Sequence, residues 1–180
     1  MPWQGRTWTG TIGAAGGTAA ARADAEAGGT EPARRRVARI GWATARRALR
    51  TGDPAGTLTR RAGTADAILL AAGPRVPADG AALAAILGAL PAGRTAIVSL
   101  PHPAWEDDAI HAILAAHGAL LGAEVGPGTP DPVLRRTGGG VALLVAPDVR
   151  LGAAWADRLA AFTAAGYDAW ILTLAPSAGP

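Results

Sequence analysis

The chain contains no cysteine, no lysine and no asparagine, and its only serines are Ser99 and Ser177. Without cysteine there is neither a disulfide framework nor a thiolate metal site. No uninterrupted apolar stretch reaches the roughly 18 residues that a membrane helix requires. The N-terminus also lacks the basic start and apolar run of a signal peptide. These absences predict a cytoplasmic protein that does not associate with a membrane, and no motif indicates a cofactor or a particular protein partner.

Alanine, glycine, proline and arginine are abundant instead. The chain has 25 Gly and 14 Pro, and arginine supplies all 17 of its Lys-plus-Arg residues. We interpret this composition as that of a GC-rich bacterium, so the number of arginines is by itself a weak sign of phosphate binding. Their distribution is uneven, because residues 1–62 hold 11 arginines against four acids, whereas residues 63–180 hold six against ten.

Three short apolar runs mark the centre and the C-terminal part of the chain, at 65–73, 94–101 and 141–147. Each has the length and continuity of a strand that is buried on both faces of a parallel sheet. Further strands are expected at 36–41 and 167–174, and helices at 42–50, 78–90, 103–121 and 151–166. This alternation predicts an α/β fold with a three-layer, doubly wound, mostly parallel sheet of the flavodoxin-like kind.

The whole chain, residues 1–180, is expected to form a single domain. Its ends, 1–7 and 175–180, are expected to be frayed, and the Gly- and Pro-rich stretch 122–140 to be a long loop. The stretch "TGTIGAAGGTAA" (9–20) is predicted to be a strand, a turn of small residues and then an alanine-rich helix. Because an open parallel sheet binds its ligands at the carboxyl ends of its strands, the turns after the predicted strands are the candidate sites.

The order of these turns resembles that of the SGNH, or GDSL-type, hydrolases. "TIGAAGGTAA" is similar to that family's first block, "RVARIGWATARRAL" to its second and "ADAILLAAGPR" to its third. "RTAIVSLPHPAWEDDAIHAIL" resembles the fourth strand with the segment after it, and "APDVRLGAAWADRLAAF" the last loop and helix. The resemblance spans most of residues 8–165 and rests on this layout rather than on exact motifs.

The residues that carry catalysis in the SGNH family are replaced at the matching positions. The family's Asp-Ser falls on Ala14 and Ala15, its oxyanion-hole Asn on Arg75 and its base His on Arg150, while Asp148 stands one place late for the acid. Alanine offers no nucleophile, and arginine stays protonated and cannot act as a base. The resemblance therefore implies a domain that cannot run the family's triad mechanism.

Three of the family's glycines are present, at Gly13, Gly41 and Gly73. They are expected to be kept because tight turns need glycine. The resemblance thus implies a non-catalytic binding or scaffolding module whose former cleft takes a small anionic or acylated ligand, held bidentately by arginine. The expected cleft residues are Gly13, Ala14, Ala15, Gly41, Gly73, Arg75, Asp148 and Arg150.

A second interpretation takes the Gly13–Gly17 turn as a phosphate loop at a helix N-terminus, as in nucleotide-binding domains. The spacing is not Gly-x-Gly-x-x-Gly, and no Gly-Lys-Ser/Thr follows. The acids nearest the expected ribose position, Asp24, Glu26 and Glu31, do not end a clear second strand. A lone glycine-rich turn is weak support for a nucleotide site.

A third interpretation starts from the arginines of residues 34–50. These are Arg34, Arg35, Arg36, Arg39, Arg46, Arg47 and Arg50. Clustered arginines favour a polyanion such as nucleic acid, and Trp42 could stack on a base. The ordinary alternative is a solvated helix face with Trp42 in the core. We therefore expect nucleic-acid binding to be weak and non-specific at most.

The remaining candidates lie close together in sequence, at Ser99, His102 and Asp107, with Asp108, His111 and His117 nearby. A Ser99–His102 pair at a strand end could serve as nucleophile and base in an active ester hydrolase or acyltransferase. The ordinary explanation is a helix start rich in acids with a satisfied histidine. The spacing matches no known metal motif, so no metal site is predicted.

Overall fold

A computed structural model of the chain describes residues 7–12, 18–23, 34–127, 137, 140–146, 149–151 and 153–174. The strands are β1 (Thr7–Ile12), β2 (Thr18–Ala23), β3 (Arg34–Gly41), β4 (Ala67–Ala71), β5 (Thr95–Ser99), β6 (Leu120–Val125), β7 (Gly140–Val145) and β8 (Asp168–Leu174). The helices are α1 (Trp42–Arg50), α2 (Pro54–Ala62), α3 (Gly80–Gly88), α4 (Asp108–Ala116) and α5 (Ala153–Ala164), with a 3₁₀ turn over Pro103–Trp105.

The strands form one closed barrel in which they follow one another in chain order, from β1 to β8 and back to β1. All neighbouring pairs from β3 to β8 are parallel, and β8 pairs in parallel with β1. Strand β2 is the exception, since it runs antiparallel to both β1 and β3. The pairing of β1 with β8 is what closes the sheet.

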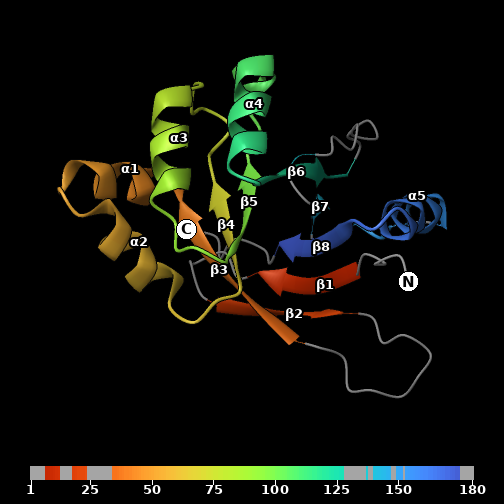
Figure 1. The fold of residues 1–180 in the computed structure, drawn as a ribbon. Coiled ribbons are helices and arrows are strands. Elements are labelled where there is room, and N and C mark those ends of the chain that lie inside the picture. The colour runs from red at the N-terminus through yellow and green to blue at the C-terminus, as the bar shows by residue number, and fades with distance from the viewer. Residues whose placement is uncertain are drawn as a thin grey trace.

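The prediction of an α/β fold with a mostly parallel sheet covered by helices is confirmed. All five helices of the described residues lie outside the barrel, with α1 to α4 along β3–β5 and α5 along β7 and β8 (Figure 1). The helices follow the strands in the order expected from the alternating apolar runs. The closure of the sheet into a barrel adds to this prediction, because the sequence alone did not indicate it.

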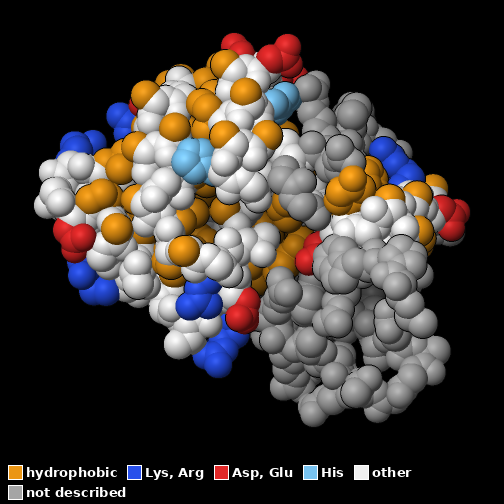
Figure 2. All heavy atoms as spheres, viewed as in Figure 1, with side chains coloured by type: hydrophobic (Ala, Val, Ile, Leu, Met, Phe, Trp, Pro, Cys, Tyr) orange, Lys and Arg blue, Asp and Glu red, His pale blue; other side chains and the backbone are white. Residues whose placement is uncertain are grey.

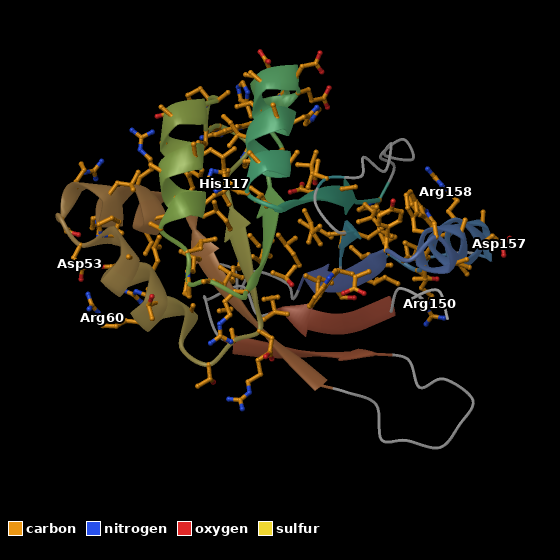
Figure 3. The ribbon with its side chains drawn as sticks, in the orientation of Figure 1. Asp53, Arg60, His117, Arg150, Asp157 and Arg158 are labelled. Carbon is orange, nitrogen blue, oxygen red and sulfur yellow. The ribbon has the colours of Figure 1, made fainter. Side chains whose placement is uncertain are left out.

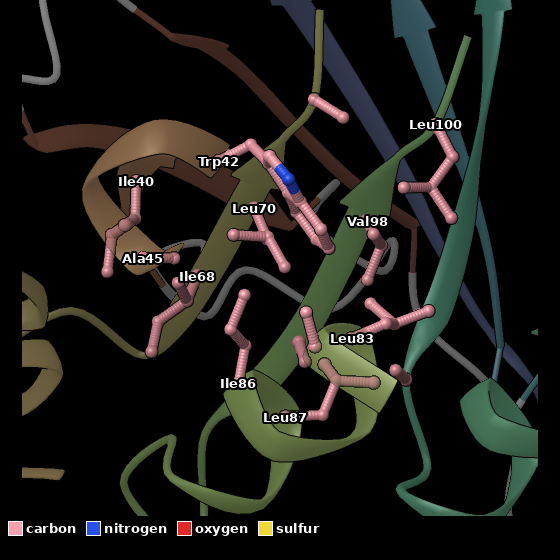
Figure 4. Packing of buried hydrophobic residues seen from close by; sticks show 14 of the residues in the cluster. Ile40, Trp42, Ala45, Ile68, Leu70, Leu83, Ile86, Leu87, Val98 and Leu100 are labelled. Atoms are coloured by element: carbon pink, nitrogen blue, oxygen red, sulfur yellow. The ribbon is translucent and has the colours of Figure 1, made fainter. Parts of the chain in front are cut away.

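Alternating side chains along the strands separate two environments. Every second residue of β4, β5, β7 and β8 points into the barrel and packs in an inner cluster of Val37, Ala67, Leu69, Ile97, Leu120, Ala142, Leu144, Trp170 and Leu172. The residues between them face outward. Those of β3, β4 and β5 pack against α1–α4 around Trp42, Leu70, Leu83 and Val98 (Figure 4). Those of β7 pack against Trp155 and Leu159 of α5.

The prediction of a helix after the first turn is wrong, because Thr18–Ala23 is the strand β2. Its sequence, TAAARA, is rich in alanine, which has the highest helix propensity. Pairing with β1 on one side and β3 on the other satisfies its backbone hydrogen bonds in the sheet instead. Tertiary context therefore overrides the local preference.

The predicted boundary between the 103–121 helix and the 122–140 loop is also wrong. Helix α4 ends at Ala116, and the chain turns at Gly118, whose φ of 62° favours glycine, before β6 begins at Leu120. The strand was missed because Gly122 and Ala123 break the apolar run. Residues 128–136 and 138–139 of the expected loop, and the expected frayed ends 1–6 and 175–180, lie outside the described residues.

In the part of the chain that the structure describes, every helix is too short or too polar to cross a bilayer.

Candidate functional site

The carboxyl ends of β3, β4 and β5 lie side by side at one end of the barrel. The strand register places Gly41, Ala71 and Ser99 next to one another. The turn that carries Gly73 and Arg75 follows β4, and His102 follows β5. The sequence-based expectation that these segments share one edge of the sheet is therefore met for β3 to β5.

Ser99 is the nucleophile candidate, and its hydroxyl is already engaged. Its side chain faces the barrel interior, because it stands two residues after inward-facing Ile97, and only 5% of the residue is exposed. The hydroxyl donates a hydrogen bond of 2.5 Å to Oε1 of Glu124, which is exposed near the end of β6. A hydrogen bond to a carboxylate is short and strong, so this contact links β5 to β6 at the barrel mouth.

Glu124 is the polar side chain at this edge that sequence reasoning missed. It lay inside the stretch predicted to be a loop, so nothing placed it beside Ser99. The available signal was the alternation of Leu120, Gly122 and Glu124, which places these residues on the inner face of β6. Such a short pattern with a central glycine is difficult to separate from a loop.

The two other catalytic candidates cap helical segments. Nδ1 of His102 accepts a hydrogen bond of 3.1 Å from the backbone N–H of Ala104. The carboxylate of Asp107 accepts one of 2.7 Å from the N–H of Ala109 at the start of α4. Ser99 and His102 are neighbours in the sequence, but the hydroxyl of Ser99 donates to Glu124 and Nδ1 of His102 accepts from Ala104, so the two do not form the expected nucleophile–base hydrogen bond.

Arg75 and Arg150, the expected anion ligands, are both exposed. In the described residues neither of them makes a hydrogen bond or an ion pair. Strands β5 and β6 lie between β4, which precedes Arg75, and β7, which precedes Arg150. With neighbouring strands about 4.8 Å apart, the two loops start about 14 Å from one another. Arg150 lies on the side of the molecule that carries α5 (Figure 3).

The remaining expected cleft residues fall outside the described residues. These are Gly13, Ala14 and Ala15, together with the rest of the Gly13–Gly17 turn, and Asp148. The expected acids of the nucleotide-binding interpretation, Asp24, Glu26 and Glu31, also lie there. Neither the proposed nucleophile position nor the phosphate-loop interpretation is therefore tested by the structure.

The expectation that Gly41 and Gly73 are kept for their backbone conformation is not supported. Gly41 has φ −71° and ψ 146°, which any residue adopts, and no described atom lies within 4 Å of a Cβ added there. At Gly73 the nearest described atom, Cγ2 of Val76, would be 4.0 Å from such a Cβ. Gly73 is also absent from the glycines with positive φ. The two matches to the family pattern therefore carry little weight.

Trp42 belongs to the core, so the ordinary interpretation of this residue is confirmed. It is 6% exposed and meets Trp105 edge to face, with ring centroids 5.1 Å apart. The indole N–H of Trp105 donates to the carbonyl oxygen of Val76 at 3.0 Å. A base cannot stack on a ring packed in this way.

Among the described residues no group of three His, Cys, Asp or Glu side chains could hold a metal ion. The arrangement at the carboxyl edge thus consists of a hydrogen-bonded Ser99–Glu124 pair, two capping residues and exposed arginines. It can recognise an anion, whereas the described side chains do not assemble a triad. No family model, curated protein or solved structure matches this chain, so the assignment of function depends on this geometry.

Proposed function

We propose that this chain is a non-catalytic binding module that holds a small anionic ligand at the carboxyl edge of its sheet, and that it is related to the SGNH hydrolases without their catalytic residues. The observation that carries the proposal is the exposed side chain of Arg75, which is unpaired among the described residues. It makes no hydrogen bond or ion pair with any of them, and it stands where the parallel strands end.

The absence of catalysis in this proposal follows from what the candidate side chains already do. The hydroxyl of Ser99 donates a hydrogen bond to Glu124, and the side chains of His102 and Asp107 accept hydrogen bonds from backbone N–H groups. A nucleophile needs a base within hydrogen-bond reach and a path to its substrate. A serine that is 5% exposed offers little such path.

The choice of an anion follows from the chemistry of the free guanidinium. Arginine presents a planar fork of donors that matches a carboxylate or phosphate, and it is always charged. Arg75 is set on the short turn between β4 and α3, where the N–H of Val76 donates to the carbonyl oxygen of Gly73 at 3.0 Å. Such a turn fixes the backbone from which the side chain extends.

The experiment is a titration of the protein with inorganic phosphate and with acetate, followed by amide chemical shifts. The matched control is Arg94, another arginine without a partner in the described residues, which precedes β5 at the opposite edge of the sheet. We expect shifts around Arg75 and a loss of binding of about tenfold in Arg75→Ala, with Arg94→Ala unchanged. Equal effects of the two variants would overturn the proposal. Arg150→Ala reports whether the second expected arginine takes part.

An ester hydrolase or acyltransferase is the second candidate, and the Ser99–Glu124 hydrogen bond of 2.5 Å is the observation that favours it. In this scheme Glu124, rather than His102, would accept the proton of the Ser99 hydroxyl as that oxygen attacks an acyl carbonyl. The burial of Ser99 is the reason to rank this candidate second.

A further inference from the structure

The outer faces of α1 and α2 carry arginines that the site described above does not use. On α1 the buried residues are Trp42, Ala45 and Ala48, and Arg47 and Arg50 are exposed on the opposite side. These two arginines are three residues apart, so they are neighbours on the helix surface.

Helix α2 packs against α1 and extends this surface. Its buried residues are Leu58 and Ala62, while Arg60 and Arg61 are exposed in its last turn. Figure 2 shows basic side chains along the edge of the molecule that α1 and α2 form. We call the exposed residues Arg47, Arg50, Arg60 and Arg61 the helical arginine surface.

The charge of this surface is largely uncompensated. Arg47, Arg50 and Arg61 make no ion pair or hydrogen bond in the described residues. Arg60 lies 3.7 Å from Asp53, with 71% and 61% of the two side chains exposed, and such a pair contributes little. Asp53 is also the sole acid between residues 42 and 62.

Two ordinary explanations account for only part of this arrangement. Codon bias explains why the basic residues are arginine, but it acts on the whole chain and does not place 11 of 17 arginines in the first 62 residues. Arginines in the last turn of a helix interact favourably with its partly negative C-terminal end, and each charge stabilises the helix by about 0.3–1 kcal/mol. That role still leaves their guanidinium groups exposed to solvent.

We propose that the helical arginine surface binds the phosphate backbone of double-stranded nucleic acid. Exposed, unpaired arginines are the groups that neutralise phosphates and release counterions. Because Trp42 is buried in the core, the surface lacks the aromatic platform that single-stranded nucleic acid requires. Binding is therefore directed at the backbone and is independent of base sequence. This site is separate from the small-anion site at Arg75.

The experiment measures binding of the full chain to labelled 20-base-pair DNA and RNA duplexes by fluorescence anisotropy at several salt concentrations. With three to four phosphates neutralised, we expect log K to fall with log salt with a slope of about −2.7 to −3.6. The test variant replaces Arg50 and Arg61 with Gln, and the matched control replaces Arg94 and Arg158, which belong to neither proposed site, with Gln. Both double variants lower the formal net charge from +3 to +1, so they separate position from total charge.

We expect the test variant to lose about 1.8 of the salt slope, which is about 0.9 per arginine, and the control variant to keep the whole slope. A duplex of either DNA or RNA that behaves in this way supports the proposal. It is overturned by no binding at low salt, by equal losses in both variants, or by competition from polyglutamate as strong as that from duplex, which would indicate an acidic protein partner. Circular dichroism checks that each variant is folded. If either double variant is not folded, the single Arg50→Gln and Arg94→Gln variants replace the two double variants.

Discussion

At the scale of single residues, the Ser99–Glu124 hydrogen bond joins two strands at the barrel mouth. Ser99→Ala removes the donor, yet Glu124 is exposed and water can solvate the freed carboxylate. We therefore expect a loss of about 1 kcal/mol in the free energy of unfolding, below the 1.5–3 kcal/mol of a fully buried charged hydrogen bond. Urea denaturation of Ser99→Ala, Glu124→Gln and the double variant measures the coupling, and additive losses would show that the contact contributes nothing.

Gly140 and Gly41 differ in the space that is available for a Cβ atom, so substituting each with alanine gives a matched comparison. A Cβ at Gly140 would clash with the backbone oxygen of Asp168 on the paired strand β8. Gly140→Ala should therefore destabilise the protein by about 1–3 kcal/mol, as overpacking does. Gly41→Ala adds a methyl group where no described atom is within 4 Å, so we expect a change of less than about 1 kcal/mol. Thermal denaturation of both variants measures these two losses of stability. A larger loss of stability in Gly41→Ala than in Gly140→Ala would contradict this account.

Residue-level prediction from sequence succeeded where a side chain's role is local and failed where it depends on a partner far along the chain. The acids at the start of α4, Asp107 and Asp108, follow from helix-end chemistry. Glu124 is 25 residues from Ser99. Its contact exists only because β5 and β6 are adjacent, and no periodicity in either segment reports that adjacency.

At the scale of elements, Asp79 links two helices. Its carboxylate caps α3 by accepting a hydrogen bond of 2.9 Å from the N–H of Ala82, and it also pairs with Arg46 of α1. Asp79→Ala should cost about 1–2 kcal/mol, mostly through the lost cap. Arg46→Ala should cost less than about 1 kcal/mol, because both partners are partly exposed.

Asp79→Asn is the control for the capping role, since asparagine is as good an N-cap as aspartate but carries no charge. It should retain most of the stability that Asp79→Ala loses. Chemical denaturation of the three variants checks the order. If Asp79→Asn lost as much as Asp79→Ala, the ion pair rather than the cap would dominate.

Elements with continuous apolar runs could be predicted from sequence, whereas elements of small residues could not. Strands β4, β5 and β7 contain enough Leu, Ile and Val in succession to be predicted as buried strands. Strand β2 is made mostly of alanine and β6 contains Gly122 and Ala123, so their burial leaves no comparable pattern. Gly122 serves close packing, since Cδ1 of Leu144 lies 2.7 Å from where its Cβ would be.

At the scale of the whole molecule, the strand order distinguishes this barrel from an open sheet. The parallel pairing of β1 with β8 brings the first and last described strands together, from Thr7 with Ala169 to Ile12 with Leu174. An alternating pattern of strands and helices is shared by open sheets and barrels, because both bury each strand between layers. Closure depends on the pairing of chain ends more than 150 residues apart, which no local pattern encodes.

The closed barrel also shapes the functional proposal. Its interior is filled by apolar side chains of the inner cluster, so ligands are expected at the rim rather than within the barrel. Among the described side chains at that rim, Ser99 and His102 hold structural hydrogen bonds, while Arg75 does not. We therefore propose that this molecule binds a ligand and does not catalyse ester hydrolysis.

Steady-state hydrolysis of a short acyl ester by the wild-type protein and by Ser99→Ala, measured side by side, tests this claim most directly. We predict that both proteins match the rate in buffer alone. Turnover by the wild-type protein that is abolished in Ser99→Ala and reduced in Glu124→Gln would contradict the claim and establish Ser99 as a nucleophile with Glu124 as its base.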